Sequence, residues 1–504
     1  NPVIETRLEA DEVDILIFAE GTYPFARGGV AAWIFELIQN LPHYTFGIVF
    51  LGAYKGMYKD YLYPMPENII SLQILYLFEY ENHDEPSRCP NEAFKNIQSV
   101  HTTFKESLHS QKTLSCPIPN LCELLENEKG MDYSQFLHSK SAWSFITEQY
   151  TQYSTAPSFV DYFWNVRNIH APLWPMGKII KKIPKAKILH SISTGYAGLL
   201  ASMAHQEYAT PLILTEHGLY TKERSLELLQ STLFPQVDLL LKNKTSYNYH
   251  HYLWINFFNA LARIAYYYAY PIISLYQGAQ IQQVRAGASE DKTRVIPNGI
   301  DIEKFAKARR NKDKSIPKIV GFVGRVVRIK DVKTFLRAVA NMVAQDKEIK
   351  AWIRAVGDED SAYYKECQNQ IDFLGLNDHI IFVEEEGMLN VLMHIGVLIL
   401  SSISEGMPLV VLESMAAGIP VIATNVGACR ELIEGRGEED KALGPCGSVT
   451  PVGNARAIAS EAVRILNDES LWHQLSAVGI KRIEKYYGRK RMIEAYNSLY
   501  KSRI

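Results

Sequence analysis

The chain has 504 residues, of which 47% are hydrophobic and 21% charged, and its formal net charge is −2. This composition excludes a disordered chain, and the near-zero net charge gives no basis for nucleic-acid binding. The chain is too long for one ordinary hydrophobic core, so we expect two or three domains.

Short apolar segments alternate with helical ones in the first half of the chain, which predicts a parallel α/β sheet. The first strand is expected at 13–19, followed by a loop with Gly28 and Gly29 and an apolar helix over 30–41. This succession is typical of the start of a doubly wound domain. The remaining strands of this half are expected at 46–51, 187–192, 211–215, 272–275 and 294–297.

Two segments of the first half depart from that pattern. From about 79 to 175 the chain is polar and aromatic, which predicts an insertion whose aromatic side chains mostly pack rather than stack on sugars. The apolar, aromatic segment 254–276 contains Asn256, Asn259 and Arg263, so it is too polar to span a bilayer. It is either a buried helix or a helix that rests on a membrane or a partner, and we expect the first.

A second series of strands and helices follows a basic linker at 304–318. Its strands are expected at 319–323, 351–356, 380–383, 397–400 and 421–424. The predicted fold is therefore α/β, with two doubly wound, Rossmann-like domains at 1–305 and 306–485. Ligands of such sheets bind at the carboxyl ends of the strands, so we expect the site in a cleft between the domains.

Segment 404–421 carries two carboxylates, Glu405 and Glu413, around a predicted helix start. Pro408 is expected in the first turn of that helix, and Gly418 is expected at its C-terminal cap. Glu405 could accept hydrogen bonds from a sugar, and Glu413 from the paired hydroxyls of a ribose. The alternative is a capping carboxylate and an ion-paired core glutamate.

Several further residues are placed to bind phosphate. The backbone amides of Leu409 and Val410 would face a phosphate at the helix start. Arg325 and Lys330 follow the strand at 319–323, where they could grip a diphosphate, or they belong to a solvated basic loop. Asp358 follows the strand at 351–356 and is a candidate for nucleotide contact.

Three candidates lie in the first domain. Gly28 and Gly29 would let a ligand approach the backbone closely, although the motif is not Gly-x-Gly-x-x-Gly, which argues against a nicotinamide dehydrogenase. His217 ends a predicted strand and is either structural or catalytic, and the same reasoning applies more weakly to His190. The six cysteines lack metal-type spacing, so we expect reduced thiols and no metal site.

Together these residues resemble glycosyltransferase family 4, which are retaining enzymes of the GT-B fold. The resemblance runs through the segments 296–301, 321–325, 404–421 and 426–433 in the family's order. Finer motifs, at 20–30, 215–224 and 427–432, are similar to one subgroup, the Pel exopolysaccharide glycosyltransferases. The acidic run 384–386 departs from the family pattern, in which many members have a glycine soon after the strand.

The resemblance implies transfer of a sugar from a UDP-sugar, UDP-glucose or a UDP-N-acetylhexosamine, to a growing polysaccharide, with no required cofactor. Arg325 and Lys330 would hold the diphosphate, Glu413 the ribose and Glu405 the donor sugar, with His217 near the reacting face of the sugar. The C-terminal helix, within 486–504, would return to the first domain. The partners would be an acceptor polysaccharide and a membrane export complex.

Residues 1–14 are charged and lack the apolar region of a signal peptide, and the cysteines predict reduced thiols in a cytoplasmic protein. The resemblance also implies a cytoplasmic enzyme, which partners would recruit to the inner membrane. Two other functions remain open. One is a sugar-nucleotide-binding or assembly subunit without turnover, and the other is a sugar-nucleotide 2-epimerase of the same fold. Release of UDP with an acceptor, and conversion of the donor alone, would separate these functions.

Overall fold

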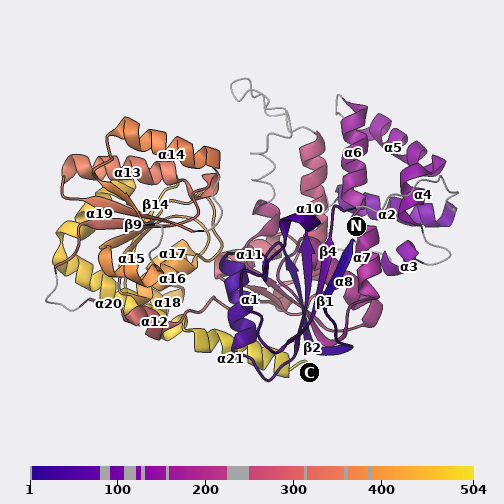
Figure 1. Cartoon of the computed structure of the whole chain (residues 1–504), viewed down its shortest axis with the longest axis horizontal. Helices are drawn as coiled ribbons and strands as arrows, with labels where there is room; N and C mark the ends of the chain where they lie inside the picture. Colours follow the sequence, from indigo (N-terminus) through magenta and orange to yellow (C-terminus); the bar gives the residue numbers. More distant parts are fainter. Residues whose placement is uncertain are drawn as a thin grey trace. The chain divides into compact units, whose positions relative to one another are not determined.

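The computed structural model describes residues 3–79, 91–106, 121–126, 131–154, 158–223, 249–310, 315–356, 361–383 and 387–504. The chain forms two compact units (Figure 1). The first comprises residues 1–274, 280–294 and 499–504, and the second comprises 275–279 and 295–498.

The first unit is built on an eight-stranded sheet with the order β1-β4-β3-β2-β5-β6-β7-β8. The pairings of the inner strands are parallel, whereas β1 pairs with β4 in the antiparallel sense. The strands are β1 (Ile4–Leu8), β2 (Glu12–Glu20), β3 (Phe46–Gly52), β4 (Ile69–Tyr76), β5 (Lys185–Ser191), β6 (Leu212–Glu216), β7 (Ile272–Ser274) and β8 (Thr293–Val295). The predicted strands of this half therefore form, and β1 and β4 are additional.

Helices cover this sheet and fill the predicted insertion. Those packed near the sheet include α1 (Gly29–Gln39), α7 (Leu173–Ile180), α8 (Tyr196–Tyr208), α10 (Tyr249–Tyr268) and α11 (Gln277–Arg285). The insertion is helical where the structure describes it, with α2 (Asn91–Glu106), α3 (Leu121–Glu126), α4 (Tyr133–His138), α5 (Lys140–Tyr153) and α6 (Phe159–His170). Helix α10 packs on α8 and α2 and contributes Phe257 and Leu261 to the core, as expected for a buried helix.

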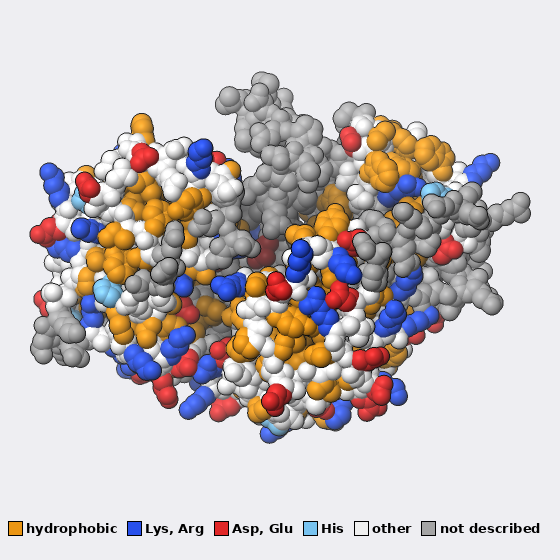
Figure 2. All heavy atoms as spheres, in the orientation of Figure 1, with side chains coloured by type: hydrophobic (Ala, Val, Ile, Leu, Met, Phe, Trp, Pro, Cys, Tyr) orange, Lys and Arg blue, Asp and Glu red, His pale blue; other side chains and the backbone are white. Residues whose placement is uncertain are grey.

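The insertion carries an exposed hydrophobic patch. Figure 2 shows hydrophobic side chains gathered in the region of α5 and α6, at the upper right. Trp143, Val160 and Trp164 are more than half exposed there, whereas Trp174 is buried. Both exposed tryptophans still contact the ring of Phe163, so the expectation that the aromatic residues of the insertion mostly pack holds for the described part of it. None of the described helices is long and apolar enough to cross a membrane.

The second unit contains a six-stranded parallel sheet with the order β11-β10-β9-β12-β13-β14. Its strands are β9 (Ile319–Gly324), β10 (Lys350–Ala355), β11 (Ile380–Phe382), β12 (Val397–Leu400), β13 (Val421–Thr424) and β14 (Gly447–Thr450). Its α-helices are α12 (Ile302–Ala306), α13 (Val332–Gln345), α14 (Ser361–Leu374), α15 (Met388–His394), α16 (Leu409–Ala416), α17 (Cys429–Glu434), α18 (Gly437–Lys441), α19 (Ala455–Asn467), α20 (Glu469–Tyr486) and α21 (Arg489–Lys501).

Apolar runs explain the central strands of this unit, because β12 and β13 are fully buried and sit between helices on both faces. The order of the sheet places β9 beside β12, so their carboxyl ends lie next to each other. The segments that follow these two strands carry Arg325 and Lys330 on one side and Glu405 on the other. The sheet thereby sets the spacing of the candidate site.

The division between the units differs from the predicted boundary at 305. Residues 295–305 belong to the second unit, because Ile300 forms a bridge with Gly488 and Phe305 lies in that unit's core. Of the predicted C-terminal segment 486–504, only residues 499–504 group with the first unit. There the hydroxyl of Tyr500 is hydrogen-bonded to His190 Nδ1 at 2.7 Å.

Candidate active site

Helix α16 begins one residue later than the sequence predicts. Pro408 has an extended backbone (φ −70°, ψ 117°) and is the N-cap residue instead of lying within the first turn. A proline suits this place because it has no N–H to leave unpaired. Gly418 lies just beyond the last helical residues with a φ of +72°, a left-handed conformation that glycine adopts readily.

Lys330 and Glu405 form an ion pair at the carboxyl ends of β9 and β12. The Lys330 Nζ lies 2.6 Å from Glu405 Oε1, and the two side chains are only 22% and 11% exposed. The Ser402 hydroxyl donates to the same oxygen at 2.5 Å. Within the described part of the chain, Oε2 of Glu405 accepts no hydrogen bond and Nζ of Lys330 donates no other. The pair can therefore still bind both a hydroxyl and an anion.

Of the other cations in this segment, two form ion pairs and one is exposed. Arg328 and Lys333 both pair with Glu366, the first at 2.7 Å and the second at 2.5 Å. Arg325 is exposed at the end of β9 and makes no ion pair with the residues that the structure describes. The interpretation of a solvated basic loop thus fits Arg328, whereas Arg325 and Lys330 retain donors for a diphosphate.

The backbone after β13 supports the loop that carries Glu405. The N–H of Ala428 donates to the carbonyl oxygen of Gly406 at 2.8 Å. Gly427 has a φ of +51°, and a Cβ atom there would lie 2.2 Å from the Gly406 oxygen and 2.4 Å from that of Glu405. Only glycine fits at this position without displacing the 405–406 backbone.

We expect Gly427→Ala to lower the melting temperature and to reduce sugar-nucleotide binding, because the new methyl group pushes the Glu405 loop outward. The cost in unfolding free energy should be about 1–3 kcal/mol. Gly375→Ala is the matched control, since Gly375 also has a positive φ of 64° but has open space around it. Equal effects of the two substitutions on binding would show that backbone strain alone is responsible.

Glu413 lies in the middle of α16 and is partly buried. Burial raises the pKa of its carboxyl to about 7, although the positive charges of Lys304 and Arg354 oppose the shift. No hydrogen-bond partner of this carboxyl is found among the described residues, so it gains from a ligand that donates hydrogen bonds to it. Leu409 and Val410 form the first turn of the same helix, so their amides lie at its positive end. Asp358 lies outside the described residues.

In the first unit, the structure brings His217 close to the helix that starts at Gly29. Trp33 of α1 meets the His217 ring edge-on, with 4.4 Å between the ring centroids. Burial lowers the pKa of His217 to about 3, so the ring is neutral, and its Nε2 has no hydrogen-bond partner among the described residues. Gly28 is the N-cap of α1, and a Cβ atom there would meet nothing within 4 Å.

His190 has a structural environment. Its two ring nitrogens are hydrogen-bonded to Tyr500 and to Thr215, and burial lowers its pKa to about 3. Glu216, which directly precedes His217, is buried and accepts hydrogen bonds from Thr194, Tyr266 and Gln283. Burial raises the pKa of Glu216, while these bonds oppose the shift.

Sequence reasoning missed Ser402 and gave no role to Glu216. The Ser-x-x-Glu spacing of Ser402 and Glu405 resembles a capping box, but in that pattern each side chain bonds to a backbone N–H at a helix start, so it does not predict the side-chain bond seen here. Glu216 directly precedes His217 and its carboxylate fixes the strand end from which that histidine projects. A charged residue at the end of an otherwise apolar strand is the signal that points to it.

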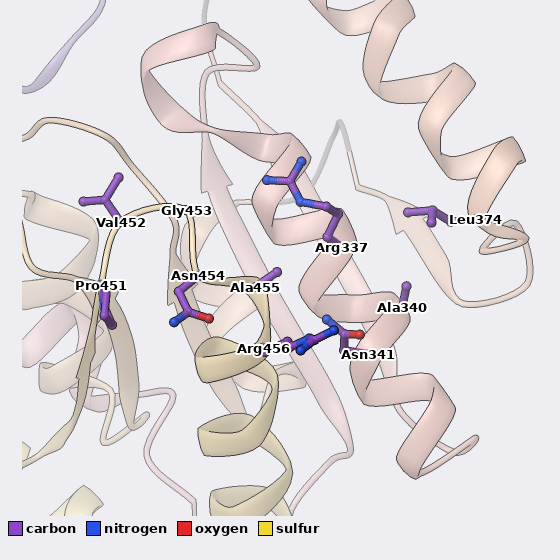
Figure 3. A pocket seen from close by; sticks show the side chains of 10 residues that line it. All are labelled: Arg337, Ala340, Asn341, Leu374, Pro451, Val452, Gly453, Asn454, Ala455 and Arg456. Carbon is purple, nitrogen blue, oxygen red and sulfur yellow. The ribbon is translucent and has the colours of Figure 1, made fainter.

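A pocket of about 540 Å³ lies elsewhere on the second unit (Figure 3). It is lined by residues of α13, the end of α14 and the loop before α19, among them Arg337, Leu374 and Arg456. None of the predicted site residues lines it. In the described part of the chain, no group of three or more His, Cys, Asp or Glu side chains is arranged to hold a metal ion.

Comparison with protein families decides the membership of the chain. A family described as "Domain of unknown function (DUF3492)" matches residues 13–291, more than half of the chain. The chain belongs to the DUF3492 family. Within this member, residues 303–482 match a second family, described as "Glycosyl transferases group 1". This match lies within the second unit and includes Arg325, Lys330, Glu405 and Glu413.

This DUF3492 member is similar to several curated glycosyltransferases. It is 25% identical over 258 residues to the capsular polysaccharide biosynthesis glycosyltransferase CapM of Staphylococcus aureus, covering 48% of this chain and 63% of CapM. It is 28% identical over 219 residues to the lipopolysaccharide core biosynthesis mannosyltransferase LpsB of Rhizobium meliloti, covering 41% and 60%. The chain thus spans less than two-thirds of the length of these relatives.

Solved structures show the same fold. Anabaena Alr3699/HepE in complex with UDP has a TM-score of 0.57 at 14% identity, covering 97% of this chain and 100% of that one. Sucrose-phosphate synthase of Thermosynechococcus elongatus has a TM-score of 0.57 at 16% identity, covering 97% and 98%. The predicted GT-B fold, with two Rossmann-like α/β units, is confirmed.

Proposed function

We propose that this protein is a retaining glycosyltransferase that moves a sugar from a UDP-sugar to a growing exopolysaccharide of the Pel type. The observation that carries the proposal is the Lys330–Glu405 pair, which keeps unused donors and an unused carboxylate oxygen beside the exposed Arg325. An anion next to a polyhydroxyl group matches this arrangement, and a sugar diphosphate has both. CapM, named for capsular polysaccharide biosynthesis, and the UDP complex of HepE support the proposal.

In the proposed reaction, the bond between the anomeric carbon and the diphosphate breaks, and the diphosphate leaves with the electron pair. Arg325, Lys330 and the amides of Leu409 and Val410 stabilise the developing charge, which is the largest contribution to such catalysis. An acceptor hydroxyl bonds to the anomeric carbon from the face that the diphosphate leaves, and its proton passes to an oxygen of the departing diphosphate. Glu405 accepts hydrogen bonds from the donor sugar, and Glu413 accepts them from the ribose.

The first unit contributes the remaining proposed contacts. His217 is neutral, and the unpartnered Nε2 suits a hydrogen bond to a sugar hydroxyl near the reacting face. Gly28 has open space around it, and Gly28 and Gly29 are proposed to let the ligand approach the backbone closely. Asp358 stays a proposed nucleotide contact. An export complex at the membrane is the proposed partner that receives the polysaccharide.

A panel of UDP- and GDP-sugars tests this function. We expect at least one UDP-sugar to raise the melting temperature and to release UDP, more so with an acceptor saccharide. NMR of the product should show the anomeric configuration of the donor. A response to GDP-sugars alone would overturn the choice of uracil, stabilisation without UDP release would indicate a binding subunit, and conversion of the donor without acceptor would indicate an epimerase.

A further inference from the structure

Buried hydroxyl groups lie at the strand ends that lead to Glu405. Ser401, Ser402 and Thr424 are all 0% exposed, and they lie at the carboxyl ends of β12 and β13. Burial removes water from these hydroxyl groups, and hydrogen bonds within the protein have to offset this desolvation cost. Here the partners all belong to the segments that hold the Lys330–Glu405 pair.

The two oxygens of Glu405 are in different environments. Oε1 receives the Ser402 hydroxyl at 2.5 Å and the Lys330 ammonium at 2.6 Å. Oε2 receives no hydrogen bond from the described residues, although the side chain is only 11% exposed. A carboxylate with both donors on one oxygen cannot rotate without losing them, because each donor contacts a single atom.

Ser402 is itself fixed from the next strand. The Thr424 hydroxyl donates to the carbonyl oxygen of Ser402 at 2.6 Å. The segment with Lys330 is tied to the same loop, since Ser401 Oγ donates to the Lys330 carbonyl oxygen at 3.0 Å and the Ile403 N–H donates to that of Ile329 at 2.8 Å. Both donors to Oε1 are therefore anchored by their own backbones.

We propose that Ser402 is a positioning residue that anchors Oε1 of Glu405 and thereby directs Oε2 toward the donor sugar. This inference rests on the proposed function and refines it. Lys330 can donate its remaining N–H groups to the diphosphate while it stays bonded to Oε1. One rigid group of side chains would then bind both the sugar and the diphosphate. Ser402 should affect recognition of the sugar and not of the diphosphate, because its hydroxyl bonds to Glu405 and not to a cation of the site.

The substitution Ser402→Ala tests this role with UDP and UDP-glucose as probes, or with the UDP-sugar that the panel identifies. We expect the affinity for UDP to change less than about twofold, since Arg325 and Lys330 remain in place. The kcat for UDP release should fall about tenfold to a hundredfold, which corresponds to the usual free energy of one hydrogen bond to a charged group. Ser402→Thr keeps the hydroxyl and should restore most of this loss.

Two further variants separate positioning from folding. Thr424→Val removes the bond that fixes Ser402 and should give a smaller loss of kcat in the same direction. Ser202→Ala is the matched control, because Ser202 is a buried serine of α8 whose hydroxyl donates to the Gly198 carbonyl oxygen. It should lower stability as Ser402→Ala does and leave kcat unchanged.

The outcomes are distinguishable. Full kcat in Ser402→Ala, or a parallel loss of affinity for UDP and UDP-glucose with a lower melting temperature, would overturn the positioning role while the proposed function stands. Absence of UDP release from every sugar nucleotide by the unaltered protein would overturn the proposed function and the positioning role with it. Loss of kcat with retained UDP affinity and rescue by threonine supports the inference.

Discussion

Replacement of both Arg325 and Lys330 by alanine is expected to abolish UDP release from the donor, with a loss of about a thousandfold or more. In the proposed function each cation stabilises the charge of the departing diphosphate, and removal of one such donor typically costs a hundredfold to a thousandfold in rate. Arg325 is exposed and unpaired in the described structure, so its loss should not affect folding. Steady-state measurement of UDP release against substrate concentration checks the result.

The matched control for this prediction is Arg328→Ala, Lys333→Ala. These two substitutions remove the same charge from the same segment, but both side chains form ion pairs with Glu366. We expect near-normal turnover and a small loss of stability, as is usual for exposed ion pairs. If the control loses as much activity as the Arg325 and Lys330 variant, general electrostatic attraction explains the effect and the diphosphate assignment fails.

Glu413→Gln is expected to stabilise the ligand-free protein above pH 7 and to weaken binding of the donor. The folded pKa of Glu413 is raised to about 7, above the ordinary value of 4.5. The folded state thus holds the proton more tightly than the unfolded state, and its contribution to stability is full below about pH 4.5 and is lost as the pH rises through about 7. The substitution should remove this loss, roughly 1–3 kcal/mol.

The affinity for UDP-glucose should also depend on the ionisation of Glu413, but it should rise with pH where the stability of the free protein falls. In the proposed function the ionised form accepts hydrogen bonds from both ribose hydroxyls, so the apparent affinity should fall about tenfold between pH 8 and pH 6 as the carboxyl is protonated. Calorimetric titration over this range, with thermal unfolding of the free protein, measures both effects. Glu434→Gln is the control, since Glu434 is an exposed glutamate paired with Arg430. A flat pH profile in the unaltered protein would contradict the ribose assignment.

The central strands and the second unit's site segments were predictable because they are apolar runs with loops at their carboxyl ends. β12 and β13 match their predicted limits. The missed strands carry polar residues: β4 buries Ser71 and Gln73, β14 has the sequence Gly-Ser-Val-Thr, and β1 is an edge strand with charged residues. Tertiary pairing overrides local pattern in such strands.

Within the site, the sequence indicated that Lys330 and Glu405 follow separate strands, but not that β9 and β12 are neighbours. It also could not show that the two charges pair at 2.6 Å or that Ser402 shares the same oxygen. Such contacts depend on side-chain conformations across a sheet, which no local spacing encodes. The raised pKa of Glu413 is easier to predict from the sequence, because a carboxylate in an apolar helix is shielded from solvent.

The path of the chain between the units has a consequence for protein engineering. The second unit comprises 275–279 and 295–498, while 499–504 belong to the first, where Tyr500 bonds to the buried His190. A fragment that stops at Arg294 would lose Tyr500 and expose one nitrogen of that histidine. A chimaera that borrows the second unit of a relative to change the donor therefore has to keep the final six residues of its own chain.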